Sequence, residues 1–283
     1  MRVSRIVGSL PDTPYLLGES LSQNPGRDLD VSVVMPCLNE ETGVVTAVLE
    51  ALGGIALAGL TGEVIVVDNG SSDGSTQQAL LAGARVVVEP HRGYGRACSR
   101  GLTEARGRIV VLGDADGTYD FGSIPLLIAA MGEGVDLVMG NRLNSDMERG
   151  AMPWLHRRVG NPVLTGLLNI LHGTSVSDAH CGLRAIRRSA LAKLRLDAPG
   201  MEFASEFLIE AASRGLRMTE VPITYRRRLG GVPKLRTWRD GWRHLKLILL
   251  RRVRRSGDSR APVTRSQIPA TRLPAVGGPP GLP

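Results

Sequence analysis

The sequence has little cysteine and no long apolar run. Its 283 residues include three cysteines, Cys37, Cys98 and Cys181, which lie far apart and form no C-x-x-C pair. This excludes a disulfide framework and favours a reducing cytosol, with all three as small core or site-wall residues. No stretch reaches the roughly 20 apolar residues that a bilayer-spanning helix needs, and the N-terminal segment has no secretory apolar core. We therefore expect a globular protein that meets a membrane only along its surface.

Charge is present but concentrated in one segment. The formal net charge is +8. Between Arg226 and Arg255, twelve lysines and arginines stand against one acid, Asp240, so this stretch carries +11 and the rest of the chain sums to −3. A local excess of this kind suits an anionic surface or phosphate groups, and no nucleic-acid-binding motif accompanies it. We expect no nucleic-acid partner.

Short β-branched runs alternate with helix-like segments through the middle of the chain. With 42% hydrophobic residues, the chain is long enough to bury a core. The alternation predicts an α/β fold, a mostly parallel, Rossmann-like sheet covered by helices on both faces. The expected strands are 31–36, 63–68, 85–89, 108–114 and 136–140. The expected divisions are a flexible leader (1–28), one domain (29–235), a basic amphipathic helix (236–255) and a disordered tail (256–283) rich in Pro, Gly, Ser and Arg.

Two carboxylates, Asp114 and Asp116, stand one residue apart directly after an apolar run. In extended backbone, residues i and i+2 point to the same side, so both carboxylates can face one point beyond the strand. Two like charges so placed repel unless a cation or a proton relieves them. Mg²⁺ or Mn²⁺ takes such oxygen ligands and shares its other positions with phosphate oxygens and water. We expect a divalent-metal site here, and a solvated turn is the alternative.

Polar residues also follow the first two strands, and parallel sheets bind ligands beyond the carboxyl ends of their strands. Asp68 ends the second strand and leads into a tight turn at Gly70 and Ser71. The N–H groups of this turn could help to hold an anion while Asp68 bonds a nucleobase or ribose. Asn39 and Glu40 follow the first strand. For these two, capping of the next helix is the simpler alternative.

A glycine pair after the third strand partly matches the motif of a different class of enzyme. Gly93 and Gly95 precede Asp114 by about twenty residues, which is the spacing of a dinucleotide-binding fingerprint. Cys98 occupies the position of the third glycine, so a nicotinamide- or flavin-dependent oxidoreductase is kept only as a distant alternative. Arg92, in the same segment, is a candidate phosphate partner or a solvated surface residue.

Two later groups of polar residues have simpler interpretations. The segment 178–181 contains an Asp, a His and a Cys, but it lacks the further ligands that a zinc site needs. Glu202, Glu206 and Glu210 recur every four residues on one face of a predicted helix. The simplest interpretation for at least one of these three is a solvated acidic face.

The basic segment 236–255 predicts an amphipathic helix. Trp238, Trp242, Leu245 and Leu249 fall on one helical stripe, with lysines and arginines flanking it. This pattern is typical of a helix in a membrane interface, where each cation near an anionic leaflet contributes about 1 kcal/mol. We therefore expect an anionic membrane surface as a partner. A helix packed on the domain with its arginines in water is the alternative.

Seven motifs occur in the order and spacing that are typical of family 2 glycosyltransferases. The motifs are VVMPCLNEE, VVDNGSSDGS, HRGYGRACSRG, DADG, DAHCGLRA, FASE and EVPITYRRRLGGVPKL. From about Val31 to Leu250 the chain most resembles the dolichyl- or polyprenyl-phosphate mannosyl- and glucosyltransferases. The resemblance implies a GT-A fold, a GDP- or UDP-hexose donor, Mg²⁺ or Mn²⁺ at the D-x-D motif, and a polyprenyl phosphate acceptor.

The resemblance also implies roles for single residues. Asp114 and Asp116 match the acids that hold the metal and the diphosphate. The implied nucleotide-sugar-binding residues are Pro36, Asn39, Glu40, Asp68, Gly70, Ser71, Arg92, Asp114 and Glu206. The implied catalytic residues are Asp116, Asp178, Arg228 and Lys234, and the implied acceptor-phosphate residues are Arg184, Arg228 and Lys234. Three positions depart from the family's pattern, since Asn69 replaces a frequent Asp, Ala204 a frequent Gln and Pro233 a frequent Ser.

Together these features predict a metal-dependent, inverting hexose transfer by in-line displacement at the anomeric carbon. A phosphate monoester has a second pKa of roughly 6, so near pH 7 it is already an anionic nucleophile. A sugar hydroxyl would need a general base. The late Arg and Lys residues favour a phosphate acceptor, and a carbohydrate or other hydroxyl acceptor is the alternative. We expect the protein peripherally at the cytoplasmic face of the membrane, and leave open an oligomer or a membrane partner protein.

Overall fold

The structure, a computed structural model, describes residues 29–143, 147–232, 234 and 237–257. The leader expected over 1–28 lies outside the described residues, as does the expected tail from residue 258 onward.

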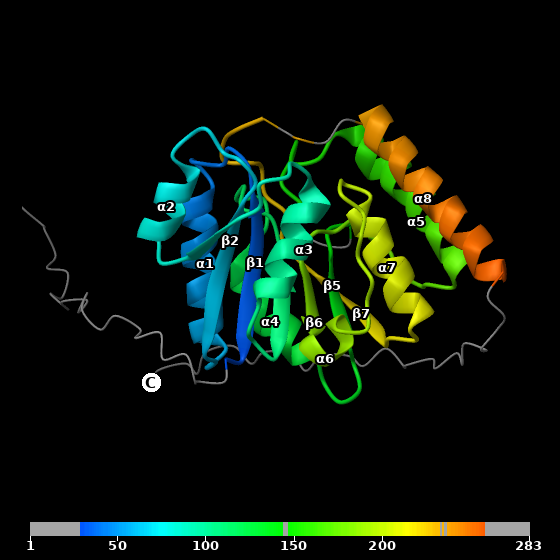
Figure 1. Cartoon of the computed structure of the whole chain (residues 1–283), viewed down its shortest axis with the longest axis horizontal. Helices are drawn as coiled ribbons and strands as arrows, with labels where there is room; N and C mark the ends of the chain where they lie inside the picture. The colour runs from blue at the N-terminus through cyan, green and yellow to red at the C-terminus, as the bar shows by residue number, and fades with distance from the viewer. Residues whose placement is uncertain (1–28, 144–146, 233, 235–236, 258–283) are drawn as a thin grey trace, which may run out of the picture.

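A mixed, mostly parallel sheet forms the centre of the described chain (Figure 1). Its strands are β1 (Val31–Cys37), β2 (Gly62–Asp68), β3 (Arg85–Val88), β4 (Ile109–Leu112), β5 (Leu137–Asn141), β6 (Arg184–Arg187) and β7 (Met218–Pro222). Their order is β3-β2-β1-β4-β6-β5-β7. β1 pairs in parallel with β2 and β4, β2 with β3, and β5 with β7, whereas β6 runs antiparallel to β4 and β5. All five expected strands are confirmed.

Helices cover both faces of this sheet, as the sequence predicts. They are α1 (Val44–Leu57), α2 (Ser75–Leu81), α3 (Tyr94–Glu104), α4 (Ile124–Ala130), α5 (Asn161–His172), α6 (Arg188–Leu191), α7 (Phe203–Ser213) and α8 (Thr237–Gly257). A short 3₁₀ turn spans Phe121–Ser123 and a π turn spans His156–Gly160. Alternate side chains of β1 enter different cores: Val33 and Met35 pack with α1 and α4, and Val34 packs with α3 and α7. This two-faced burial explains the continuous apolar run of β1.

β6 is a strand that the sequence pattern did not predict. Its residues, Arg184–Arg187, read RAIR. Two of its four residues are arginines, and a run this short carries no clear periodicity. Its backbone forms ladder hydrogen bonds with β4 and β5 on its two sides. Pairing partners distant in sequence, which propensity cannot report, make this segment a strand.

Helices α7 and α8 meet through charged side chains. Arg243 Nη2 lies 2.7 Å from Glu202 Oε1, and Arg251 bonds both Glu206 and Glu210. The three glutamates are 6%, 1% and 6% exposed. The expectation that at least one of them lies on a solvated face is therefore wrong. The acidic stripe of α7 instead docks the basic side of α8 onto the domain.

A buried histidine pair lies at the same interface. The ring centroids of His180 and His244 are 4.7 Å apart. Burial lowers the pKa of His244 to about 4, with Asp240 favouring the charged ring and Arg184 and Arg243 disfavouring it. Burial, followed by the neighbouring His244, also holds the pKa of His180 well below its usual value. Both rings are therefore neutral near pH 7.

Acid is expected to destabilise the protein through this pair. An unfolded histidine binds a proton below about pH 6.5, whereas the folded chain does not protonate His244 until about pH 4. Above about pH 6.5 the buried histidine pair does not lower the free energy of unfolding. Below that pH the free energy of unfolding falls, and His244 alone lowers it by roughly 2 kcal/mol at pH 5. Urea denaturation at pH 7.5 and pH 5 measures the loss. His244→Gln, whose amide can still form a hydrogen bond with Ser205 Oγ, should lose less, and an equal loss in both proteins would contradict the assignment.

Candidate active site

The carboxyl ends of β2, β1 and β4, which are neighbours in the sheet, bring three acidic segments to one edge. Asp68 ends β2, Asn39 and Glu40 follow β1, and Asp114 and Asp116 follow β4. This is the upper edge of the sheet in Figure 1. The strand ends in which the sequence placed its candidate residues therefore meet in space.

A hydrogen-bonded turn after β2 fixes Asp68. Its Oδ1 accepts the N–H of Ser71 (3.0 Å) and its Oδ2 accepts the N–H of Gly70 (3.3 Å). Gly70 has a φ of 87°, in the left-handed region that favours glycine. Asn39, with a φ of 53°, donates its N–H to Ser71 Oγ (3.0 Å) and accepts from the N–H of Ser72 (2.8 Å). The loops after β1 and β2 thus form one bonded unit, with Asp68 only 8% exposed within it.

The hydrogen bonds of the Asn69 side chain explain one departure from the family's pattern, the Asn that replaces a frequent Asp. Its Nδ2 donates to the carbonyls of Glu89 (3.0 Å) and His91 (2.9 Å), and its Oδ1 accepts the N–H of Gly93 (2.7 Å). A carboxylate at this position could donate neither bond. Arg92 of the same loop is exposed, and its Nη2 donates to the Gly70 carbonyl (2.9 Å). Asn69 therefore ties this loop to the end of β2.

The two carboxylates after β4 differ in their partners. Asp114 Oδ1 accepts the Tyr94 hydroxyl at 3.0 Å. Asp116 Oδ1 accepts both the N–H (3.0 Å) and the hydroxyl (2.6 Å) of Thr118. Burial, followed by the neighbouring charge of Asp116, raises the pKa of Asp114 to about 7, although Tyr94 and Arg228 act in the opposite direction. The negative charge of the pair is thus incompletely balanced.

This imbalance fits a divalent cation. A carboxylate whose pKa rises through burial and like charge is stabilised by a nearby positive ion. Within the described ranges, no group of three or more His, Cys, Asp and Glu side chains could hold a metal by itself. Asp114 and Asp116 would therefore supply part of a six-oxygen shell and leave the rest to phosphate and water, as Mg²⁺ commonly requires.

Two cations after β7 contact acids of the same sheet edge. Arg228 Nη2 lies 2.7 Å from Asp116 Oδ2, and its Nη1 lies 2.7 and 2.6 Å from the two oxygens of Glu40. Lys234 Nζ lies 3.5 Å from Glu40 Oε1. Burial raises the pKa of Glu40, although Arg228 and Lys234 lower it. Glu40 therefore faces these cations rather than capping α1, whose first turn contains no acidic residue.

Asp178 lies beside this site but is fully buried. Its oxygens accept from Arg142 Nε (2.7 Å), Arg142 Nη2 (2.8 Å) and Asn161 Nδ2 (2.6 Å). Burial alone would raise the pKa of Asp178, but Arg142 and Asn161 lower it to about 2. Arg142 in turn lies 5.1 Å from the ring centre of Tyr225. The structure therefore places Asp178 as the partner that orients Arg142.

Three implied site residues lie inside the fold. Arg184 is 2% exposed and donates to the carbonyls of Cys181, Ala204 and Ala179. Glu206 accepts the N–H groups of Asp197 and Ala198 and pairs with Arg251 of α8. Pro36 is buried within β1. The hydrogen bonds and ion pairs of Arg184 and Glu206 thus go to backbone groups and to Arg251 rather than to the acids of the sheet edge.

Sequence reasoning missed three contributors to the site. Tyr94 bonds Asp114, Arg142 pairs with Asp178, and Gly182 closely approaches Asp114. A Cβ at Gly182 would lie 3.2 Å from Asp114 Oδ2 and 3.0 Å from the Tyr119 hydroxyl. The missing side chain lets the Gly182 loop approach Asp114. Arg142 could have been found, because it directly follows β5 at the same edge.

The glycine pair of α3 serves helix packing. A Cβ at Gly95 would lie 2.0 Å from the Ala198 carbonyl oxygen, and one at Gly93 would lie 2.2 Å from that of Pro199. The N–H of Gly95 donates to the same Pro199 carbonyl (3.1 Å). The residues of the dinucleotide-like spacing thus face a protein loop, which removes the support for a nicotinamide or flavin site.

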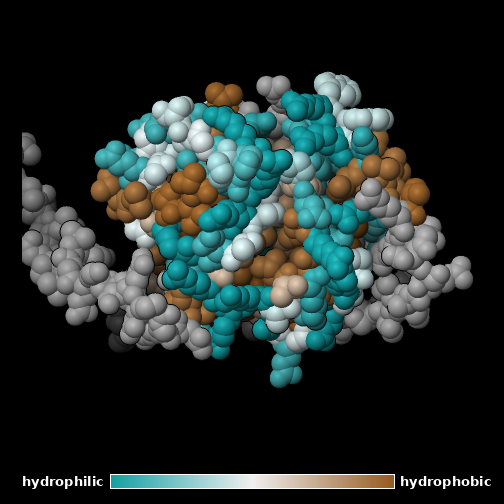
Figure 2. Space-filling model, in the orientation of Figure 1, coloured by the Kyte–Doolittle hydropathy of each residue, from teal (hydrophilic) through white to brown (hydrophobic). Residues whose placement is uncertain are grey.

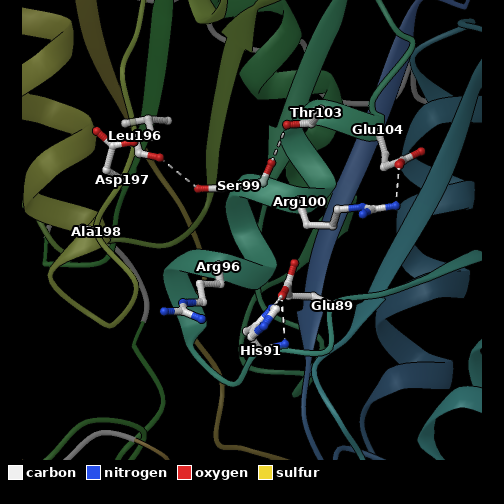
Figure 3. Close-up of a pocket in the computed structure, with 10 residues that line it drawn as sticks. All are labelled: Glu89, His91, Arg96, Ser99, Arg100, Thr103, Glu104, Leu196, Asp197 and Ala198. Carbon is white, nitrogen blue, oxygen red and sulfur yellow. Dashed lines mark hydrogen bonds and ion pairs between the residues drawn. The ribbon is translucent and has the colours of Figure 1, made fainter.

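A separate groove of about 440 Å³ lies between α3 and the segment 196–198 (Figure 3). Its walls carry both signs of charge, including Glu89, Arg96, Arg100 and Asp197. None of its ten lining residues belongs to the acidic sheet edge. One of them, Glu89, lies at the start of the loop that Asn69 holds. The chemistry of the candidate site therefore lies outside this groove.

The profile of Glycosyl transferase family 2 matches residues 32–195, more than half of the chain. The chain belongs to this family. The resemblance inferred from the motifs is thus confirmed, as are the GT-A fold and the identification of the protein as a glycosyltransferase.

Relatives of this glycosyltransferase include two proteins of Haloferax volcanii. The low-salt glycan biosynthesis hexosyltransferase Agl6 is 41% identical over 236 residues, which are 82% of this chain and 57% of Agl6. The chain therefore spans little more than half of that relative. A dolichyl-phosphate hexose transferase is 35% identical over 71% of this chain and 85% of its own length. Both relatives are thus named for hexose transfer, and the second name also includes dolichyl phosphate.

A solved structure extends the comparison to bound ligands. Glucosyl-3-phosphoglycerate synthase from Mycobacterium tuberculosis, crystallised with Mn²⁺, UDP-glucose and phosphoglyceric acid, superposes with a TM-score of 0.62. It is 26% identical, and the match covers 82% of each chain. The solved structures similar to this chain thus include a glycosyltransferase that was crystallised with a divalent metal and a nucleotide sugar.

Proposed function

We propose that this glycosyltransferase moves a hexose from a nucleotide-diphosphate sugar to the phosphate of a polyprenyl phosphate, with inversion. The observation that carries the proposal is that Asp114 and Asp116 share one sheet edge with two cations, Arg228, which contacts Asp116, and Lys234, which contacts the neighbouring Glu40. An acidic pair suited to a metal beside cations suited to a phosphate is the arrangement that this reaction needs. The related dolichyl-phosphate hexose transferase supports the choice of acceptor.

Different residues of the site bind the donor and the acceptor. In this proposal Asp68, held by the N–H groups of Gly70 and Ser71, binds the nucleoside. Asp114 and Asp116 hold Mg²⁺ or Mn²⁺, which when bound stabilises the negative charge that grows on the leaving diphosphate. Arg228 binds the oxygens of the acceptor phosphate, since a guanidinium can contact two oxygens of one phosphate at once.

A phosphate acceptor also fits the protonation states of the site. Near pH 7 a phosphate monoester is already largely dianionic, because its second pKa is roughly 6. It can attack the anomeric carbon without losing a proton to the protein. Asp178 is buried and paired with Arg142, so it is badly placed as a base for a hydroxyl acceptor. Its proposed role is to position Arg142.

We further propose that the protein binds an anionic membrane surface peripherally, at the cytoplasmic face, through α8 and its neighbour α5. None of the helices in the described residues combines the length and apolar character that a bilayer crossing needs. His172 of α5 contacts the Ile248 carbonyl of α8, so the two helices lie side by side. Figure 2 shows apolar surface at the right of the view, where α8 lies. The exposed apolar side chains of α5 and α8 include Val163, Ile170, Trp238, Trp242, Leu249 and Val253.

The reaction class is tested by transfer from labelled UDP- and GDP-hexoses to lipid. Purified full-length protein is supplied with Mg²⁺ or Mn²⁺ and polyprenyl phosphate in anionic vesicles. We expect one donor to place label in the organic-extractable lipid, in a product cleaved by mild acid. If a donor binds with metal but labels only a water-soluble hydroxyl acceptor, the phosphate acceptor is wrong and the hydroxyl alternative replaces it.

A further inference from the structure

The segment that follows β7 lies across the acidic residues of the site. We call residues 225–232 the strap. The N–H of Leu229 donates to the Asp116 carbonyl (3.3 Å). A Cβ added at Gly231 would lie 3.1 Å from Glu40 Oε2. The strap passes along the upper edge of the sheet in Figure 1. Its Arg228 side chain contacts Glu40, which follows β1, and Asp116, which follows β4.

Arg228 of the strap joins two acidic segments through one guanidinium. Nη2 lies 2.7 Å from Asp116 Oδ2, while Nη1 lies 2.7 and 2.6 Å from the Glu40 oxygens. The planar fork of arginine can hold two carboxylates at once, whereas the ammonium of Lys234 is a point charge. The contact of Lys234 is with Glu40, at 3.5 Å. Two cations thus share Glu40, and Arg228 also reaches Asp116.

The contact between Arg228 and Asp116 occupies an oxygen that a metal held by Asp114 and Asp116 would need as a ligand. Asp116 Oδ1 already accepts two hydrogen bonds from Thr118, so Oδ2 is the oxygen better placed to become a ligand. A divalent ion and a guanidinium on the same oxygen repel one another in a partly buried site. The Arg228 side chain is 22% exposed, which leaves it room to move away from Asp116.

We propose that Arg228 is an exchangeable counter-ion of this site. In this proposal Arg228 neutralises Asp116 until the metal and the donor diphosphate bind, and it then leaves Asp116 while keeping its contact with Glu40. The freed Nη2 end binds the acceptor phosphate. The inference rests on the proposed function, because it assigns a phosphate to the freed guanidinium. It deepens that function by linking the two substrates through one side chain.

The exchange predicts that metal-nucleotide and acceptor phosphate bind with positive coupling. Before the exchange, a phosphate must compete with the Asp116 carboxylate for Arg228. After it, the two positive charges of the metal balance Asp114 and Asp116, and the guanidinium is available. Coupling between sites is reciprocal and commonly changes affinity by 5-fold to 150-fold. We expect about 10-fold here.

The first experiment measures Mn²⁺ binding to the full-length chain, in the presence of UDP, from the electron paramagnetic resonance signal of free Mn²⁺. Arg228→Gln removes the competitor and is expected to tighten Mn²⁺ binding about 10-fold. Lys234→Gln is the matched control, because it removes the same charge beside Glu40 without a bond to Asp116, and it should change Mn²⁺ binding by less than about 3-fold. Equal tightening in both variants would reduce the effect to general electrostatics and overturn the proposal, as would weaker binding in Arg228→Gln.

The second experiment needs no substitution. Binding of geranyl phosphate, a water-soluble isoprenyl phosphate, is measured by calorimetry with UDP alone and with UDP and Mn²⁺. About 10-fold tighter binding with Mn²⁺ supports the exchange, and equal affinity overturns it while leaving the proposed acceptor intact. If geranyl phosphate binds in neither condition, the phosphate-binding half of the inference falls together with the proposed acceptor. The Mn²⁺ titration then still decides whether Arg228 competes for Asp116.

Discussion

Asp116→Asn is expected to lower the rate of sugar transfer by about 10³-fold or more. The asparagine keeps the shape of the side chain and can still accept from Thr118, but it removes a charge from the proposed metal site. Stabilisation of a leaving group by a metal contributes several kcal/mol, and each 1.36 kcal/mol corresponds to a factor of ten in rate. The measurement is the initial rate of label transfer to polyprenyl phosphate at saturating Mg²⁺ or Mn²⁺.

Two controls separate chemistry from folding in this experiment. The thermal unfolding midpoint of Asp116→Asn should lie within a few degrees of the wild-type value, because both residues can accept the Thr118 bonds. Asp73→Asn changes an exposed acid at the same sheet edge, and its rate should stay within about 3-fold of wild type. An Asp116→Asn protein that transfers sugar at a rate near wild type would remove Asp116 from the metal site.

The position of the acids at the strand ends could be predicted from sequence, because it depends on local geometry. Asp68, Asp114 and Asp116 stand directly at the ends of β-branched runs, and parallel strands place their carboxyl ends at one edge. The pattern that predicts the strands therefore also predicts that these side chains gather. Only the strand order was needed in addition, and β2, β1 and β4 are adjacent in it.

The roles of the other candidate residues depend on contacts between residues distant in sequence. Arg228 and Glu40 are 188 residues apart, and no periodicity links them. Arg184 and Glu206 matched family motifs, but a motif does not report which way a side chain faces. Burial among backbone carbonyls determines the role of Arg184, and the arrival of Arg251 from α8 determines that of Glu206.

Amphipathicity alone did not identify which side of helix α8 packs on the domain. Charged and polar residues of α8 face the domain, since Asp240 and His244 are 6% and 5% exposed. Its tryptophans face away, with Trp238 and Trp242 at 87% and 66% exposure. An apolar stripe ordinarily covers a core, but here α7 offers glutamates to the basic side of α8 instead. The alternative of a helix packed with its cations in water therefore describes only part of what the structure shows.

The replacement Trp238→Ser with Trp242→Ser is expected to weaken binding to anionic vesicles by roughly 100-fold. A covered tryptophan buries roughly 200 Å², so covering about a quarter of each side chain contributes ~1.3 kcal/mol per residue at ~25 cal/mol per Å². Lys246→Gln should cost less, about 1 kcal/mol, and its effect should vanish in high salt. Co-sedimentation of the full-length chain with vesicles of 30% anionic lipid measures both losses.

The matched control for that experiment is Leu57→Ser with Leu81→Ser, which removes two exposed leucines from α1 and α2. These lie on elements away from α5 and α8, so vesicle binding should be unchanged. All three tryptophans of the chain are exposed, Trp154 at 70% before α5 and the other two on α8, so their emission should shift to the blue when vesicles bind. Unchanged co-sedimentation of the tryptophan variant, with no shift in wild type, would mean that the outward apolar stripe of α8 contacts a protein surface instead, because 87% exposure of Trp238 leaves its apolar area uncovered within the described chain.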